Sequence, residues 1–140
     1  PVLCSFTHEQ DQETEQMFNS FTRTLYDVLS QFKGSTCVIA SVDLAHIGLA
    51  YGDTFKPDPR FLADVERSDK KILDIVANQD RHQFQRYFQQ TGNEYHVCGY
   101  AALRTFLEIL PDAEGYFLDY DNSIMDNNRS TVTYGGMIFI

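Results

Sequence analysis

Apolar side chains recur every three or four residues in four stretches of this chain, and this spacing predicts four α-helices. The predicted helices cover residues 10–32, 59–77, 80–92 and 99–111. Asp58 followed by a proline is typical of a helix start, because the carboxylate accepts from otherwise unpaired N–H groups and the proline lacks an N–H. About half of the chain is therefore expected to be helical.

The faces of these helices can be predicted from the same pattern. Residues 10–32 carry one apolar stripe that we expect to be buried, consisting of Met17, Phe18, Phe21, Leu25, Val28, Leu29 and Phe32. The middle of the second helix, Glu66 to Lys71, is charged and is expected to face solvent. We expect the acidic residues Glu9, Asp11, Glu13 and Glu15 to form a solvated helix start, which the helix dipole favours.

Four apolar stretches predict β-strands at residues 2–6, 36–42, 116–120 and 132–140. The run 36–42 has no polar alternation and is rich in β-branched residues, which is typical of a strand buried on both faces. With the first helix between them, the first two strands predict a β-α-β unit. The glycine pair in the last strand indicates a bulge or a close backbone approach. The fold class is therefore α/β, with a mixed β-sheet flanked by helices in one domain.

Composition and charge restrict the classes of partner expected for this domain. The chain has 140 residues, is 43% hydrophobic and carries a net charge of −9. The hydrophobic fraction favours a globular protein. The negative net charge argues against nucleic acid or an anionic membrane as a partner, because both attract basic surfaces. The chain opens on Pro1 within an apolar stretch, so we expect it to be a piece of a longer protein or a product of processing.

The cysteines Cys4, Cys37 and Cys98 are odd in number and form no Cys-x-x-Cys pair. This spacing favours reduced thiols and a cytoplasmic location over a disulfide framework or a structural zinc site. We expect Cys4 and Cys37 to lie in the core of the sheet. Cys98 precedes a glycine at a predicted helix start, where the helix dipole lowers a thiol pKa and makes a thiolate metal ligand. The alternative is that Cys98 is only a small buried hydrophobe.

Asp43 and His46 follow the apolar run 36–42, at the edge of the sheet where functional side chains of α/β proteins collect. His46 is a candidate general acid/base or metal ligand, and Asp43 could orient it. In the alternative interpretation, Asp43 caps a short turn and His46 is a partly buried structural residue. Pairing of His46 with the Cys98 thiol would instead predict a hydrolase, but no oxyanion motif accompanies the pair.

Other candidates carry weaker signals. Tyr51 and Phe55 lie on a loop with glycines and are candidates to line a substrate pocket. His96, two residues before Cys98, is a weaker candidate than that cysteine. His8 and His82 lie among charged residues at predicted helix starts and are expected to be solvated.

The segment from Ser41 to Gly48 resembles the Ser-x-Asp-x-x-His-x-Gly signature of the Memo family, which includes AmmeMemoRadiSam system protein B. Cys98-Gly99 resembles the family's Cys-Gly, and residues 130–136 resemble its closing strand. The similarity extends over essentially the whole chain in order. It implies a fold similar to the class III extradiol dioxygenases, which use non-haem Fe(II).

By this resemblance, His46 takes the place of the acid/base histidine beside the metal, Asp43 lies next to it, and Cys98 offers a thiolate to the metal. The family's two metal-binding histidines belong to an N-terminal half that this sequence does not contain. The resemblance therefore implies that residues 1–140 are the C-terminal portion of a single Memo-like domain, which its N-terminal half completes as a partner.

Two functions remain open. The first is a metal-dependent, dioxygenase-like redox site that uses Fe(II) or Cu, and in which the fragment alone is inactive. The second is a non-catalytic binding module that engages a small molecule, a peptide or a protein through the same cleft.

Overall fold

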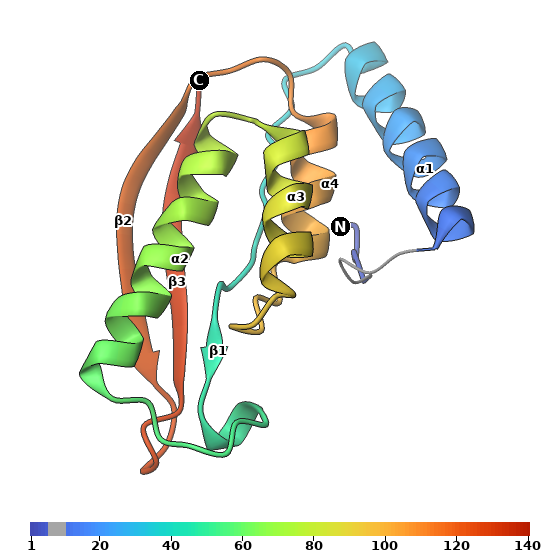
Figure 1. The fold of residues 1–140 in the computed structure, drawn as a ribbon. Coiled ribbons are helices and arrows are strands. Elements are labelled where there is room, and N and C mark those ends of the chain that lie inside the picture. The colour runs from blue at the N-terminus through green and yellow to red at the C-terminus, as the bar shows by residue number, and fades with distance from the viewer. Residues whose placement is uncertain (6–10) are drawn as a thin grey trace.

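In the computed structural model, which describes residues 1–5 and 11–140, four α-helices accompany a three-stranded sheet (Figure 1). In chain order the elements are α1 (Gln12–Gln31), β1 (His46–Ile47), the 3₁₀ turn η1 (Leu49–Tyr51), α2 (Pro59–Ala77), α3 (Arg81–Thr91), α4 (Tyr100–Ile109), β2 (Gly115–Ile124) and β3 (Thr131–Phe139). The α/β class predicted from the sequence is confirmed. No helix in the described ranges is long and apolar enough to cross a membrane.

The predicted helix boundaries agree closely with the structure because local capping sets them. Asp58 Oδ1 accepts from the N–H groups of Arg60 and Phe61 at 2.9 and 2.8 Å and so starts α2. Asp80 caps α3 in the same way. Gly92 ends α3 in the left-handed conformation, with φ of 61°, which glycine adopts without a steric penalty.

The sheet has the order β1-β3-β2, and both pairings are antiparallel. The last two predicted strands are confirmed as β2 and β3, and β2 extends to Ile124. A register shift between Phe117 and Asp119 leaves Leu118 as the extra residue, so the predicted bulge lies on β2, opposite the glycine pair. A Cβ on Gly135 would come within 2.9 Å of Leu73, so this glycine allows α2 to approach the sheet closely.

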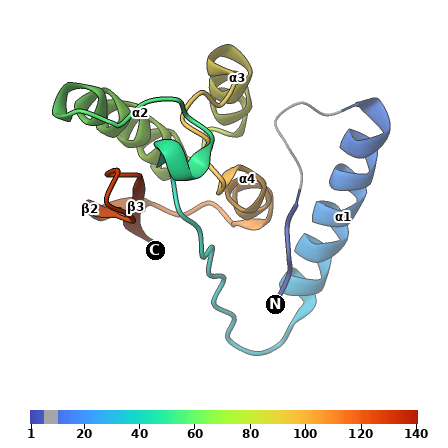
Figure 2. The ribbon, with the colours of Figure 1, turned by 90° about the horizontal axis from the view of Figure 1, so that it is seen from below.

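The main core cluster lies between the hairpin formed by β2 and β3 and the three helices α2, α3 and α4. In Figure 2, α2 lies over one face of this hairpin, and no described helix covers the other. Phe84 and Phe88 of α3 pack against Tyr100 of α4, with ring centroids 5.6 and 4.9 Å from the tyrosine ring. Burial of one such phenylalanine contributes about 1.5–3 kcal/mol.

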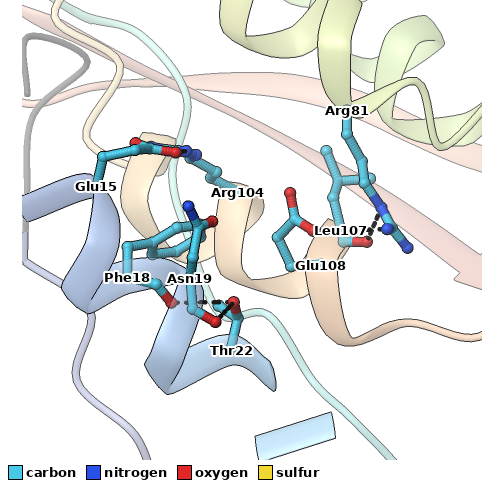
Figure 3. Close-up of polar contacts among 8 residues, drawn as sticks. All are labelled: Glu15, Phe18, Asn19, Thr22, Arg81, Arg104, Leu107 and Glu108. Carbon is cyan, nitrogen blue, oxygen red and sulfur yellow. Dashed lines mark hydrogen bonds and ion pairs between the residues drawn. The ribbon is translucent and has the colours of Figure 1, made fainter. Parts of the chain in front are cut away.

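Helix α1 lies against α4 on the side away from the hairpin (Figures 1 and 2). Glu15 accepts from the buried guanidinium of Arg104 at 2.5 Å, and that guanidinium lies 4.2 Å above the ring of Phe18 (Figure 3). Thr22 donates to the Phe18 carbonyl one turn away. In the predicted acidic helix start, Glu15 therefore pairs with Arg104 while 40% of its side chain stays exposed, and Asp11 caps the helix.

Most of the predicted apolar stripe of α1 is not buried. Phe18 is buried, but Met17, Phe21, Val28 and Phe32 are exposed. Since these four share one side of the helix, α1 has an apolar face that no described element covers.

The predicted strands 2–6 and 36–42 are not formed: residues 2–5 and 36–42 pair with no strand among the described residues. The predicted β-α-β unit is therefore wrong for the described chain, and its sheet is antiparallel. Cys37 is exposed and Cys4 only partly buried, so the prediction that both lie in the core is also wrong. Phe6, His8 and Glu9 lie outside the described residues.

The charged middle of α2 contains one further departure from expectation. Asp69 is 0% exposed, although Glu66 to Lys71 was predicted to face solvent. Its position on the helix explains this, because residue 69 lies on the same face as Val65, Ile72 and Val76.

Candidate metal and acid–base site

Asp43, His46 and Cys98 come together in the structure. One ligand atom from each of the three side chains lies within 4.8 Å of the other two. Asp43 and Cys98 are exposed and His46 is partly buried, so a solvent-borne ligand can reach the group. Asp43 and His46 lie at the start of β1, and Cys98 lies just before α4.

The ring of His46 is fixed in one orientation. Its Nδ1 lies 3.1 Å from the carbonyl oxygen of Leu44, and its Nε2 lies 3.9 Å from Asp43 Oδ2. A carbonyl only accepts hydrogen bonds, so Nδ1 is the ring nitrogen that donates to Leu44, and Nε2 is the ring nitrogen that faces Asp43. A histidine held through Nδ1 by a carbonyl is the usual arrangement around a protein metal ion.

The Cys98 thiol lies 3.8 Å from the main-chain carbonyl of Asp43 and donates to it. Partial burial raises the pKa of this thiol above its ordinary value, and the nearby Asp43 carboxylate adds to the increase. The prediction that the helix start lowers the pKa of Cys98 is therefore wrong. A bound cation would favour the thiolate, because the positive charge stabilises it directly.

Two glycines allow the segments around the site to approach one another. A Cβ on Gly99 would lie 2.7 Å from the Asp43 carbonyl oxygen and 3.0 Å from Val42 Cβ. Gly48 has φ of 106°, and a Cβ there would lie 2.9 Å from Ser130 Cα. Gly99 thus lets the Cys98 segment approach Asp43, and Gly48 lets the His46 segment approach Ser130.

Tyr51 lies beside the site, with its ring edge-on to His46 at a centroid distance of 4.9 Å. Phe55 does not contact this pair but packs against Phe61 at 4.8 Å, and Phe61 packs against Tyr95 at 5.7 Å. The Tyr95 carbonyl accepts from the His46 main-chain N–H at 2.9 Å. Tyr51 thus lies directly against His46, whereas Phe61 and Tyr95 pack on the core cluster that includes Ala45 and Ile47.

The sequence patterns did not point to Asp69, which is tied to the site through a threonine. Asp69 Oδ2 accepts from Thr133 Oγ1 at 2.6 Å and from the Tyr120 hydroxyl at 2.8 Å. Thr133 Oγ1 in turn accepts from the N–H of Ala45 at 2.8 Å, next to His46. Burial raises the pKa of Asp69, since its Oδ1 has no hydrogen-bond partner among the described residues. The helical spacing from Val65 to Val76 is the signal that could have identified it.

The other histidines do not join the site. His96 is exposed, and its Nδ1 lies 3.2 Å from the main-chain oxygen of His46, so it contacts the site only through the backbone. His82 is exposed on α3, in agreement with its predicted solvation. His8 lies outside the described residues.

The three donors are compatible with a metal ion. Thiolate, imidazole and carboxylate all bind divalent ions at about 2.0–2.3 Å, so ligands of one ion lie within about 4.6 Å of each other. The observed separations of up to 4.8 Å need only small side-chain rotations to reach this geometry.

Comparison with known proteins gives a consistent picture. The sequence model of a family described as Memo-like protein matches residues 2–138. A MEMO1 family protein from Aquifex aeolicus (strain VF5) is 31% identical over 144 residues, which cover 99% of this chain and 34% of the relative. The chain thus spans about a third of the length of this relative.

Proposed function

This chain belongs to the Memo-like protein family, and on that premise we propose that Asp43, His46 and Cys98 form part of a divalent-metal site with dioxygenase-like redox chemistry. The observation that carries the proposal is the approach of three different donor atoms to within 4.8 Å of one another. Two of these donors come from one segment and the third from a segment beyond α3, so chain proximity alone does not explain the cluster.

We assign a different role to each residue. Cys98 supplies a thiolate ligand, and the soft sulfur favours Fe(II) or copper over magnesium or calcium. His46 is held through Nδ1 and therefore accepts or gives a proton at Nε2, the atom that faces Asp43. Asp43 attracts the protonated form of that ring. When bound, the metal would supply Lewis acidity and a redox centre.

One thiolate ligand does not complete such a site. The chain spans about a third of its Aquifex relative, so we propose that residues 1–140 are a portion of a single Memo-like domain. In this proposal the remaining ligands come from the N-terminal half of the same protein. A thiolate ligand must stay reduced, so a cytoplasmic location suits a chain whose three cysteines are all unpaired.

Anaerobic titration with Co(II) tests the metal site when the portion of the Aquifex aeolicus MEMO1 family protein outside the matched stretch is added to supply the remaining ligands, because a cobalt–thiolate bond gives a strong near-ultraviolet charge-transfer band. We expect the chain to develop this band and Cys98→Ser to lose it. Cys37→Ser is the matched control, since Cys37 is also an exposed, unpaired thiol but lies outside the cluster. Equal bands in both variants, or no band in the unmodified chain, would overturn the proposal.

The tyrosine beside the site supports a second candidate function. The ring of Tyr51, edge-on to His46 at a centroid distance of 4.9 Å, offers an aromatic surface for a small molecule or a peptide. In this alternative the chain is a binding module without turnover. Ligand binding that survives both Cys98→Ser and His46→Ala, in protein free of metal, would favour the module over the metal site.

A further inference from the structure

The edge of β3 that faces β1 is unpaired over most of its length. Strand β1 pairs with β3 only at Val132 and Thr131, and main-chain bonds from Leu44 and Ala45 continue this contact to Thr133. Beyond Thr133 the chain that precedes β1 diverges from β3 (Figure 2).

Main-chain groups of a strand point alternately to its two sides. Gly135, Met137 and Phe139 therefore direct their N–H and C=O groups to the same side as Thr133. No described residue hydrogen-bonds to them there. Gly136 and Ile138 point the other way, toward β2. The open edge therefore offers the N–H and C=O groups of three residues.

This edge borders an apolar groove of about 670 Å³. Met137 and Phe139 line one side, Val38 and Ile39 line the other, and Leu73 of α2 contributes to the lining between them. Ile39 is 81% exposed although it lies in a run whose sequence is typical of a strand buried on both faces. The groove thus lies between residues 36–42, which pair with no described strand, and the edge of β3 that faces away from β2.

We propose that this groove binds an extended apolar strand, which pairs with β3 at residues 135–139 and packs against residues 36–42. Unpaired main-chain groups in an apolar groove are costly, and an added strand satisfies them in a way that a helix cannot. Asp112 is the single charged residue among those that line the groove, so the lining favours apolar residues in the strand.

The occupant we commit to is a strand from the part of a Memo-like polypeptide that this chain does not match. The Aquifex relative has about two thirds of its length outside the match, which is ample to supply strands. This inference rests on the proposed function in one respect, since both invoke the same missing polypeptide. Completing the sheet at β3 would also bring that polypeptide close to Leu44 and Asp43, at the end of the groove.

Residue-resolved amide hydrogen exchange tests this proposal on the labelled chain. The probe is the portion of the Aquifex aeolicus MEMO1 family protein outside the matched stretch, added as a separate polypeptide. We expect the amides of Gly135, Met137 and Phe139 to exchange at least tenfold more slowly when the probe is present. The amides of Gly136 and Ile138 are internal controls, because they already bond to β2.

Two matched variants then locate the contact. Ile39→Asp places a charge in the groove at an exposed position, so it should leave the fold intact and weaken probe binding at least tenfold. Leu3→Asp makes the same kind of change at a residue that is 94% exposed and does not line the groove, and it should bind normally. An equal loss of probe binding in both variants would reject the groove as the binding site.

Other outcomes also decide against the proposal. If the probe leaves the exchange rates of the three amides unchanged, the proposed strand pairing is wrong. Protection of the same amides in the chain alone, rising with its concentration, would show that a second copy is the occupant. Removing metal with a chelator should not alter the protection, so failure of the metal site and failure of the strand-binding groove give separate results.

Discussion

Residues 43–140 contribute every buried side chain of the described chain except Phe18 and Thr22. Residues 1–42 nevertheless contain a helical apolar stripe and a continuous apolar run, the two patterns that most strongly predict burial. In residues 1–42 these apolar residues lie on exposed surfaces, such as the Phe21 side of α1 and the run around Ile39.

The difference comes from where each element finds its neighbour. In residues 43–140, helices α2, α3 and α4 follow one another and cover each other and one face of the hairpin of β2 and β3. In residues 1–42, α1 finds a neighbour through contacts of Glu15 and Phe18 with Arg104, and the run 36–42 packs against the core only through Ala40 and Val42 among the described residues. A hydrophobic pattern thus identifies the surface that can be buried, but it does not identify the element that buries it.

The largest test of this comparison replaces one phenylalanine in each region. Phe88→Ala removes a ring that is 1% exposed, and we expect it to lower the free energy of unfolding by about 3–5 kcal/mol. Phe21→Ala removes a ring that is 42% exposed and should change the free energy by less than about 0.5 kcal/mol. Urea denaturation measures both. A comparable loss in Phe21→Ala would mean that the stripe of α1 is already covered.

A second test concerns the contact that brings Cys98 to Asp43. Gly99→Ala places a Cβ against the Asp43 carbonyl, so we expect a loss of roughly 1–3 kcal/mol in unfolding free energy and at least tenfold weaker cobalt binding. Gly136→Ala is the control, because its Cβ meets nothing closer than 3.8 Å. Unchanged cobalt binding in Gly99→Ala would show that this spacing does not govern the site.

Local signals account for what the sequence predicted well. The caps Asp58, Asp80 and Gly92 act within one helical turn, so the sequence alone placed the ends of α2 and α3 correctly. The hairpin was predictable for the same reason, since its two strands are close in sequence and pair with each other.

Non-local contacts account for the errors. The run 36–42 was correctly identified as strongly apolar, but strand formation needs a partner that the described chain does not provide. The sequence singled out Asp43, His46 and Cys98, yet their approach depends on Gly99 packing against Asp43, which no spacing rule reveals. Asp69 was missed because its charge was given more weight than its place on the buried side of α2.

A third, smaller effect is the pH dependence caused by Asp69. Folding raises the pKa of this buried carboxyl above 3.8, so the folded state holds the proton more tightly than the unfolded state. The contribution of Asp69 to the free energy of unfolding is therefore fully present below pH 3.8. It falls by about 1.4 kcal/mol per pH unit until the folded-state pKa is reached. Asp69→Asn lacks this group, so its urea midpoint should not fall over that range. Tyr120, the neighbouring titratable group, has a raised pKa and stays protonated there. Parallel pH curves for the two proteins would contradict this account.

The smallest effect compares the caps of the two regions. Asp58→Ala removes a carboxylate that accepts two N–H bonds at the start of the packed helix α2, and it should lower the free energy of unfolding by about 1 kcal/mol. Asp11→Ala removes the cap of α1, which bonds to the Thr14 N–H at 2.7 Å. Because α1 contacts residues 43–140 mainly through α4, its loss should accelerate amide exchange in α1 while the urea midpoint of the remainder stays unchanged.

The Thr14 bond also lowers the pKa of Asp11, so the stabilisation that this cap gives α1 is present above pH 3.8 and is lost as the pH falls through the folded-state pKa. In the unmodified chain, acid should therefore reproduce the exchange pattern of Asp11→Ala, once the intrinsic pH dependence of exchange is removed. If Asp11→Ala instead lowers the midpoint of the whole chain, α1 unfolds together with residues 43–140. The two regions would then form one cooperative unit despite the difference in their burial.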